Sequence, residues 1–357
     1  MENKNLPILG ITCGDLNGVG MELIIRTFSN EYIYKYCTPV LYCNPKPIAF
    51  LKKSYKQLEF KYHIIDEAKN AKPGQINLVV SSDAEFRVEL GKQSKESGAE
   101  ALKSLNKAME DAKRGTLDAI VTAPLDKSTV AESHEGFTGH TGFIANELGS
   151  NDFCMILYAD DFRVALATEH VSVDKIATTL TSELIENKIN AVHKSLIEDF
   201  LITRPRIAVL GLNPHAGDGG VIGKEEIEII KPAIEKTFET GKLVFGPYPA
   251  DSYFSGRNMH NFDAVIAMYH DQGLIPFKSV AFHDGINFTA GLSLIRTSPD
   301  HGTAYDIAGK NEASITSFQA AVHEAILLHN NRLQHIEDYN NPLSFGELKR
   351  ERFRINF

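Results

Sequence analysis

The chain alternates short runs of β-branched and aliphatic residues with longer segments of helical periodicity, and this alternation restricts its fold more than any other feature. It is typical of βαβ units, in which a mostly parallel sheet is covered by helices. The strand candidates are Ile8–Thr12, Val40–Cys43, Ile76–Val80, Ala119–Thr122, Cys154–Tyr158, Arg163–Ala167, Ile207–Leu212 and Ala264–Met268. The helix candidates are Gly98–Lys113, Thr141–Leu148, Ser182–Phe200, Lys224–Thr240, which Pro232 should kink or divide, and Ser314–His329.

The composition excludes several classes of function. A net charge of −9 over 357 residues gives no basic field for nucleic acid or an anionic membrane, so an anionic substrate needs local cations. No apolar run approaches the roughly 18 residues that span a bilayer, and the N-terminus lacks the pattern of a signal peptide. Four cysteines without a CxxC pair indicate reduced thiols, with a Cys37–Cys43 disulfide as the less favoured alternative. We therefore expect a cytoplasmic protein.

Three histidines follow three of the predicted strands. FRVALATEH ends in His170, RIAVLGLNPH in His215 and DAVIAMYH in His270. Open α/β sheets bind ligands beyond the carboxyl ends of their strands, and three imidazoles with one open position form a catalytic metal site. A single histidine at a strand end is more often structural, but three with the same placement make a shared metal an equal alternative.

Polar and basic residues gather in the loops at the same predicted edge. Lys127 follows a strand, and the stretch FTGHTGF offers Thr138, His140 and Thr141 before an apolar helix, where free N–H groups suit an anion. Lys278, Asn287 and Arg296 follow His270 and could hold a phosphate or carboxylate. Each has a simple alternative, such as ordinary helix capping or a solvated surface charge.

Taken together and in order, these motifs resemble the 4-hydroxythreonine-4-phosphate dehydrogenase family of pyridoxal phosphate biosynthesis. The motifs that carry the resemblance are CGDLNGVGME, TAPLDK, FTGHT, ATEH, GLNPHAGDGG, PADS, AMYHDQGLIPFK and GINFTAGLSLIRTSPDHGTAYDIAG. The resemblance implies a three-layer α/β/α fold in two lobes with a central cleft, of the isocitrate/isopropylmalate dehydrogenase type and not the Rossmann type. The lobes expected are residues 1–130 plus 290–357, on the nucleotide side, and 131–289, for metal, substrate and dimerisation.

The resemblance also implies roles for individual residues. His170, His215 and His270 match metal ligands, in a homodimer whose active site is shared across the interface. The metal expected is zinc, with magnesium, manganese and cobalt as alternatives. His140, Thr141, Lys278, Asn287 and Arg296 match substrate contacts, and Asp251 and Lys278 are the candidates for proton transfer. His301, Gly302, Thr303 and Asp306 lie in a stretch that resembles an adenosine-binding loop.

One part of the first motif departs from the family pattern. Leu16, Asn17 and Met21 stand where the family often has other residues, which leaves the shape of this loop open. Asp306 is an acid where relatives that prefer NADP carry a cation, so we expect NAD, with NADP as the alternative.

The implied reaction is the oxidation and decarboxylation of 4-hydroxythreonine 4-phosphate to 3-amino-2-oxopropyl phosphate, CO₂ and NAD(P)H. A related sugar acid, threonate or erythronate 4-phosphate, is the alternative substrate. The alternatives from other classes are a phosphate acyltransferase and a non-catalytic protein that binds a phosphorylated metabolite.

Overall fold

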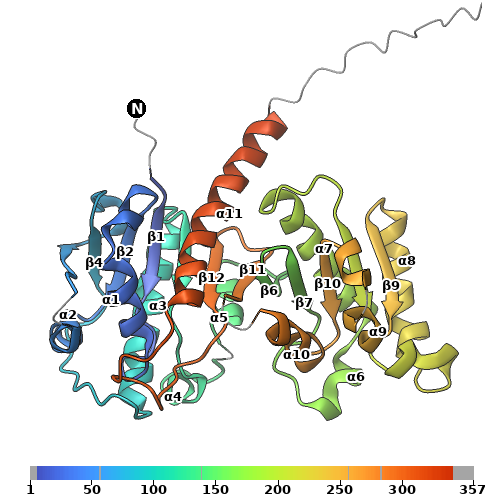
Figure 1. Ribbon diagram of the computed structural model, residues 1–357, viewed down its shortest axis with the longest axis horizontal. Helices are drawn as coiled ribbons and strands as arrows, with labels where there is room; N and C mark the ends of the chain where they lie inside the picture. The colour runs from blue at the N-terminus through green and yellow to red at the C-terminus, as the bar shows by residue number, and fades with distance from the viewer. Residues whose placement is uncertain (1–5, 56–57, 138, 256, 282–283, 341–357) are drawn as a thin grey trace, which may run out of the picture.

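The computed structural model describes residues 6–55, 58–137, 139–255, 257–281 and 284–340, so Thr138 of the FTGHT motif lies outside the described residues. One 12-stranded sheet runs across the molecule in the order β3-β4-β2-β1-β5-β12-β11-β6-β7-β10-β8-β9 (Figure 1). In sheet order, the strands are β3 (Tyr62–Ile65), β4 (Ile76–Val80), β2 (Thr38–Cys43), β1 (Ile8–Thr12), β5 (Ala119–Thr122), β12 (Ile295–Pro299), β11 (Ile286–Ala290), β6 (Cys154–Ala159), β7 (Phe162–Leu166), β10 (Ala264–Ala267), β8 (Arg206–Leu210) and β9 (Leu243–Tyr248).

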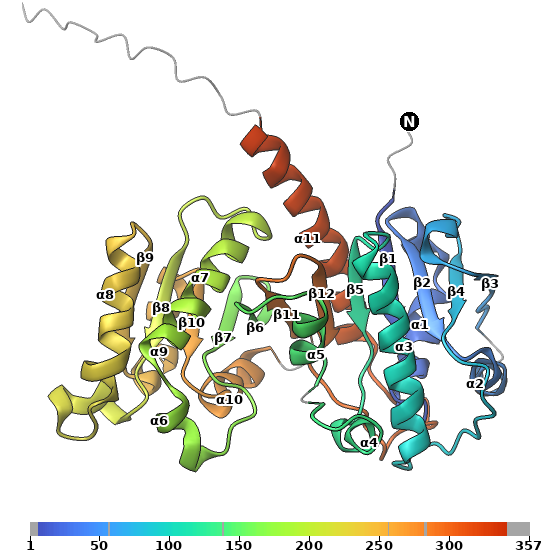
Figure 2. The same ribbon diagram turned by 180° about the vertical axis from the view of Figure 1, so that it is seen from behind.

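The sheet is mostly parallel, as predicted, but its middle is not. β11 pairs antiparallel with both β12 and β6, and β6 pairs antiparallel with β7. All other pairings are parallel, which leaves a parallel half on each side of the middle strands. Figure 2 shows these halves as two lobes, with α11 rising between them. The carboxyl ends of β5 and β12, which are parallel neighbours, and of β7 face the space between the lobes.

Helices cover both faces of the sheet, which confirms the predicted three layers. They are α1 (Gly20–Phe28), α2 (Pro45–Leu51), α3 (Lys95–Lys113), α4 (Lys127–Ala131), α5 (His140–Glu147), α6 (Ile176–Thr179), α7 (Ser182–Glu198), α8 (Lys231–Glu239), α9 (Ala250–Ser255), α10 (His270–Val280) and α11 (Thr316–Asn340). None of the helices in the described ranges combines the length and apolar character that crossing a membrane requires.

The two faces of the sheet are packed differently. On one face, a single core joins α1, α11, α7 and α8 across both lobes. On the other face, one core lies under α3 and α5 and a separate core lies under α10 and α9. Alternate residues of β6 feed the two faces, as the period of two in a strand requires, with Ile156 in the continuous core and Leu157 in one of the divided cores. The division leaves room for a cavity between the lobes on the second face.

Several elements depart from the expected ranges, each for a physical reason. β11 and β12 were not predicted because polar residues such as Asn287 and Arg296 interrupt their apolar pattern. β9 was missed because it is an edge strand that contains glycine and proline. The helix expected at Lys224–Thr240 is divided, with a π-helical turn at Glu226–Ile230 before α8, as Pro232 predicted.

The four cysteines are buried and free, so the alternative of a Cys37–Cys43 disulfide is wrong, and the expectation of unpaired thiols holds. The division into lobes of residues 1–130 plus 290–357 and 131–289 stays a prediction. It agrees with the pairing of β12 to β5, which returns the chain to the first half of the sheet.

Candidate active site

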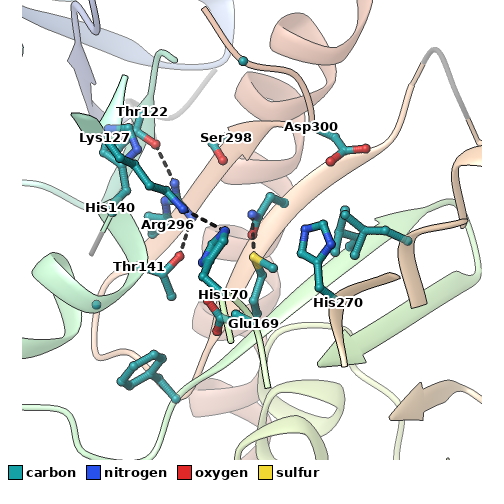
Figure 3. Close-up of a pocket in the computed structure, with 18 of the residues that line it drawn as sticks. Thr122, Lys127, His140, Thr141, Glu169, His170, His270, Arg296, Ser298 and Asp300 are labelled. Atoms are coloured by element: carbon teal, nitrogen blue, oxygen red, sulfur yellow. Dashed lines mark hydrogen bonds between the residues drawn. The ribbon is translucent and has the colours of Figure 1, made fainter. Parts of the chain in front are cut away.

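A cavity of about 520 Å³ lies between the lobes at the carboxyl ends of β5, β7 and β12. Figure 3 shows that side chains from both lobes point into it. The predicted site residues that line it are His140, Thr141, His170, His270, Asn287, Arg296, His301 and Gly302. The sheet therefore brings together residues from FTGHT, ATEH, AMYHDQG and the long last motif, which lie up to 162 positions apart in the chain (140 to 302).

Arg296 forms the floor of this cavity. Its side chain is 2% exposed, and its guanidinium donates to the hydroxyls of Thr122 at 2.9 Å, Thr289 at 3.3 Å and Thr141 at 3.4 Å. Its Nε has no hydrogen-bond partner, and no ion pair of Arg296 occurs among the residues that the structure describes. Burial lowers the pKa of Arg296 to about 10. A buried guanidinium without a carboxylate is costly, so this cation is suited to an anionic ligand.

The start of α5 lies beside Arg296. His140 and Thr141 are its first residues, so their backbone N–H groups have no partner within the helix and can face an anion. Burial, reinforced by Arg296 and Lys127, holds the pKa of His140 well below its usual value, so the ring is neutral. Its Nε2 is buried without a partner in the described part of the chain. This corner of the cavity offers hydrogen-bond donors that await a ligand.

Lys127 reaches into the cavity and contacts His170. Its ammonium Nζ lies 2.7 Å from Nε2 of His170, to which it donates (Figure 3). Gly139 permits this approach, since a Cβ there would lie 2.9 Å from Cε of Lys127. Burial, then Lys127, then His270 lower the pKa of His170 to about 4, which leaves its ring neutral and able to donate a lone pair. The sequence alone favoured a surface position for Lys127, and this contact was missed.

His270 begins α10, directly after β10, and faces His170 with 5.8 Å between the ring centroids. Its Nδ1 lies 2.7 Å from a carboxylate oxygen of Asp271, a pairing that directs Nε2 of a histidine toward a metal. Two imidazoles that share a cavity fit two positions of a divalent metal site.

His215 is not part of this pair. It is exposed in the turn Pro214–Gly220 and does not line the cavity between the lobes. In the described ranges, no group of three His, Cys, Asp or Glu side chains is placed to hold a metal. One chain thus supplies two of the three expected ligands to the cavity.

A second cavity, of about 430 Å³, adjoins the first. Asp300, His301 and Gly302 line both, whereas Lys278 lines only the second of the two. Lys278 Nζ lies 3.5 Å from the carboxylate of Asp300, whose pKa is raised by burial. Asp300 was not predicted from the sequence, although it stands at the end of β12, directly before the adenosine-like loop.

The remaining predicted residues lie farther out. Asp251 is exposed at the start of α9, and Asp306 is exposed in the loop after β12; neither lines these two cavities. Thr303 also lines neither, because its carbonyl accepts a hydrogen bond from the backbone of Val19. Glu169 lines the first cavity and was not predicted, because the strand-end pattern pointed to the adjacent histidine.

Comparison with known proteins places this geometry in context. A family model described as pyridoxal phosphate biosynthetic protein PdxA matches residues 35–325. A curated 4-hydroxythreonine-4-phosphate dehydrogenase from Bacteroides thetaiotaomicron is 47% identical over 344 residues, which cover 96% of this chain and 94% of the relative. A relative from Oceanobacillus iheyensis, provisionally named D-threonate 4-phosphate dehydrogenase, is 37% identical over 328 residues, which cover 90% of this chain and 98% of the relative. The crystal structure of 4-hydroxythreonine-4-phosphate dehydrogenase from Klebsiella pneumoniae superposes with a TM-score of 0.80 at 33% identity, covering 92% of this chain and 99% of that one.

Proposed function

This chain belongs to the PdxA family of pyridoxal phosphate biosynthetic proteins, and we propose that it oxidises and decarboxylates 4-hydroxythreonine 4-phosphate with a nicotinamide cofactor. The products are 3-amino-2-oxopropyl phosphate, CO₂ and NAD(P)H. The observation that carries the proposal is the cavity itself, which is lined by the buried Arg296 and by His170 and His270. Arg296 forms no ion pair among the described residues, and the ring of His170 is neutral. A phosphorylated hydroxy acid supplies both the negative charge and the hydroxyl that such a cavity takes.

The anionic groups of the substrate find their counter-charges on Arg296 and Lys127. Neither cation has a carboxylate partner among the ion pairs of the described residues, so both are available to a phosphate or carboxylate. Neutral His140 and the hydroxyl of Thr141 add hydrogen bonds that fix the orientation of the bound group. A substrate that fills the cavity between the two lobes would displace water from these contacts.

His170 and His270 would hold a divalent metal, zinc first, with magnesium, manganese and cobalt as alternatives. Such an ion lowers the pKa of a bound hydroxyl and stabilises negative charge on oxygen. His215 and Asp251 would then come from a second copy of the chain. Both are exposed, and their elements, the turn Pro214–Gly220 and α9, pack against each other, so one approaching subunit presents both.

The residues that line the second cavity would hold a nicotinamide cofactor, which would supply a hydride acceptor. Lys278 and Asp300 lie where the two cavities meet, and we assign Lys278 to proton transfer with Asp300 as its hydrogen-bonded partner. His301 and Gly302 border both cavities and would contact the cofactor. Asp306 favours NAD over NADP, because a carboxylate accepts a hydrogen bond from a ribose hydroxyl and repels a phosphate.

D-Threonate 4-phosphate is the second candidate substrate, since one relative carries its name. It differs from 4-hydroxythreonine 4-phosphate in having a hydroxyl where the other has an ammonium group. Glu169 lines the substrate cavity and offers a carboxylate to that ammonium, which favours the amino substrate.

The proposal is tested by NADH formation with each substrate and by metal analysis of the purified protein. We expect turnover of 4-hydroxythreonine 4-phosphate that is lost on chelation and restored by a divalent metal. Turnover in metal-free buffer would contradict the metal assignment, and acyl transfer from an acyl phosphate without metal would support the acyltransferase alternative. Tight binding of substrate and metal without NADH formation would identify a non-catalytic binding protein.

A mixing experiment tests whether the site is shared between subunits. His170→Ala and His215→Ala should each abolish activity, whereas a mixture allowed to exchange subunits should recover about a quarter of the wild-type rate, because each hybrid dimer has one intact site. A mixture of His170→Ala and His270→Ala should recover nothing, since both residues line the same cavity of one chain. His323→Ala, on the exposed side of α11, is the control for loss of a histidine. Equal recovery in both mixtures would contradict the shared site.

A further inference from the structure

The second cavity is bordered by a loop formed by residues 301–309 (the 301–309 loop). The walls of the cavity include Val19, His301, Ala304 and Ile307. Lys278 and Asp300 supply the charged groups of this cavity, whereas the 301–309 loop contributes backbone, apolar side chains and the buried, unpartnered Nε2 of His301. The shape of the loop, more than any charge on it, determines what the cavity can hold.

The 301–309 loop contains a backbone conformation that must be held in place. Ala304 has a φ of +44°, in the left-handed region where a Cβ is unfavourable. A non-glycine residue in this region persists when the surrounding contacts determine its conformation. The left-handed conformation of Ala304 therefore depends on contacts between the loop and other segments of the chain.

Three contacts hold the loop against the first loop of the chain. The amide of Val19 donates to the carbonyl of Thr303 at 3.0 Å, and a Cβ at Gly18 would lie 2.7 Å from that carbonyl oxygen. The hydroxyl of Tyr305 donates to Asp15 at 2.8 Å. The loop residues that make these contacts, Thr303 and Tyr305, are the two chain neighbours of Ala304.

Asp15 is at the centre of the contacts that hold the 301–309 loop. It is 0% exposed, and besides Tyr305 its carboxylate accepts from the hydroxyl of Ser97 and the amide of Asn17, each at 2.8 Å. Asn17, 1% exposed, in turn bonds the backbone of Glu89 and Lys92. The motif that departed from the family pattern at Asn17 is thus a buried support, not a loop tip that contacts substrate.

We propose that Asp15 is a positioning residue for cofactor binding, which acts through Tyr305 to hold the 301–309 loop in the left-handed turn that shapes the second cavity. The inference rests on the proposed placement of the nicotinamide cofactor in that cavity. Asp15 lines neither cavity. Removal of the Tyr305 hydroxyl leaves Asp15 with Ser97 and Asn17, so the carboxylate stays hydrogen-bonded while the loop loses one of its two hydrogen bonds to the first loop.

The test compares Tyr305→Phe with wild type in steady-state kinetics and in direct NADH binding by fluorescence. We expect KM for NAD and Kd for NADH to rise about five- to tenfold, the net effect of one hydrogen bond expressed in cofactor binding. The kcat at saturating cofactor and KM for the phosphorylated substrate should stay within about twofold. Hydrogen exchange of residues 302–309 should accelerate, and Asp15→Asn, which keeps the shape of the side chain, should shift the same values in the same direction.

Tyr42→Phe is the matched control. Tyr42 is a buried tyrosine of β2 whose hydroxyl donates to Asp111 of α3 at 2.8 Å, the same pairing and length. It should change thermal stability without moving KM for NAD, because neither Tyr42 nor Asp111 lines a cavity or bonds the 301–309 loop in the described structure. A rise in KM for NAD in Tyr42→Phe equal to that in Tyr305→Phe would reduce the effect to general destabilisation and overturn the proposal.

A cavity-wall variant separates this inference from the cofactor site on which it rests. His301→Ala should weaken NADH binding because His301 lines the cavity directly. If His301→Ala weakens binding and Tyr305→Phe does not, the positioning role of Asp15 is wrong and the cofactor site stands. If neither weakens binding, the cofactor site is wrong and the positioning role falls with it.

Discussion

The two cavities differ in how they are prepared for a ligand. The substrate cavity holds side chains with unmet bonding capacity, namely Arg296 without a carboxylate and His140 and Asn287 with buried polar atoms that have no partner in the described residues. The second cavity owes its shape to a backbone turn at Ala304, held by hydrogen bonds from a buried loop. In the substrate cavity, the unfavourable free energy comes from a desolvated charge. In the second cavity, it comes from a strained backbone conformation.

This difference has consequences for stability. A desolvated cation costs several kcal/mol until a ligand neutralises it, whereas one left-handed residue costs about 1–3 kcal/mol. Substitutions that remove the buried charge of the substrate cavity should therefore lower activity and raise the free energy of unfolding. Both changes should be larger than those caused by substitutions in the loop of the second cavity.

The largest effect is expected from Arg296→Met, which removes the buried charge of the substrate cavity. Activity should fall about 10³-fold, because the substrate loses a buried charge-assisted contact that stabilises its anionic group. The free energy of unfolding should rise by about 1–4 kcal/mol, since an apolar side chain of similar volume replaces a buried cation whose charge is only partly offset by Glu169. Turnover and urea denaturation of the same preparation measure both. A less stable and inactive variant would show that Arg296 is structural.

Arg332→Met is the matched control for this prediction. Arg332 pairs with the buried carboxylate of Asp199 at 2.8 Å, far from the cavity, between α11 and the end of α7. Its loss leaves Asp199 buried and unpaired, which should lower stability by about 3–5 kcal/mol with little change in kcat/KM of the remaining folded enzyme. The two arginines should thus shift stability in opposite directions.

An intermediate effect is expected at Glu169, the acid that lines the substrate cavity. Glu169→Gln should lower kcat/KM for 4-hydroxythreonine 4-phosphate about tenfold relative to D-threonate 4-phosphate, because the amide does not neutralise the ammonium group. Competition between the two substrates measures the ratio directly. Glu186→Gln, which removes the half-buried carboxylate partner of the exposed Lys236, should leave the ratio unchanged. An unchanged ratio in Glu169→Gln would place the ammonium group elsewhere.

Much of the fold follows from the sequence where burial is simple. Ile8–Thr12, Ile76–Val80 and Ala119–Thr122 were predicted with the bounds that β1, β4 and β5 have, because an apolar strand in a parallel sheet is buried on both faces. β11 and β12 were missed for the opposite reason. Their Asn287 and Arg296 serve the cavity, so the strands that carry the site lose the apolar pattern by which strands are recognised.

The sequence predicted many of the residues that line the first cavity, but not the geometry of that cavity. Strand ends brought His170 and His270 together because neighbouring strands deliver their ends to one edge. No periodicity reveals that Lys127 contacts His170, that Asp300 separates the two cavities, or that Asp15 and Asn17 are buried, since each depends on contacts between distant segments. His215 is the limiting case, because its proposed partners lie in another copy of the chain.

The smallest effect is expected from Ala304→Gly, which tests whether the left-handed turn at Ala304 in the second cavity is strained. Glycine adopts the φ of +44° without the steric penalty of a Cβ, and the same substitution at Ala308, which lacks a positive φ, adds flexibility with no such relief. Urea denaturation should therefore find Ala304→Gly more stable than Ala308→Gly by about 1 kcal/mol. KM for NAD should change by less than about threefold in Ala304→Gly, because the contacts of Thr303 and Tyr305 remain. Equal stability of the two variants would mean that the turn at Ala304 stores no strain, and the second cavity would then differ from the first only in size and polarity.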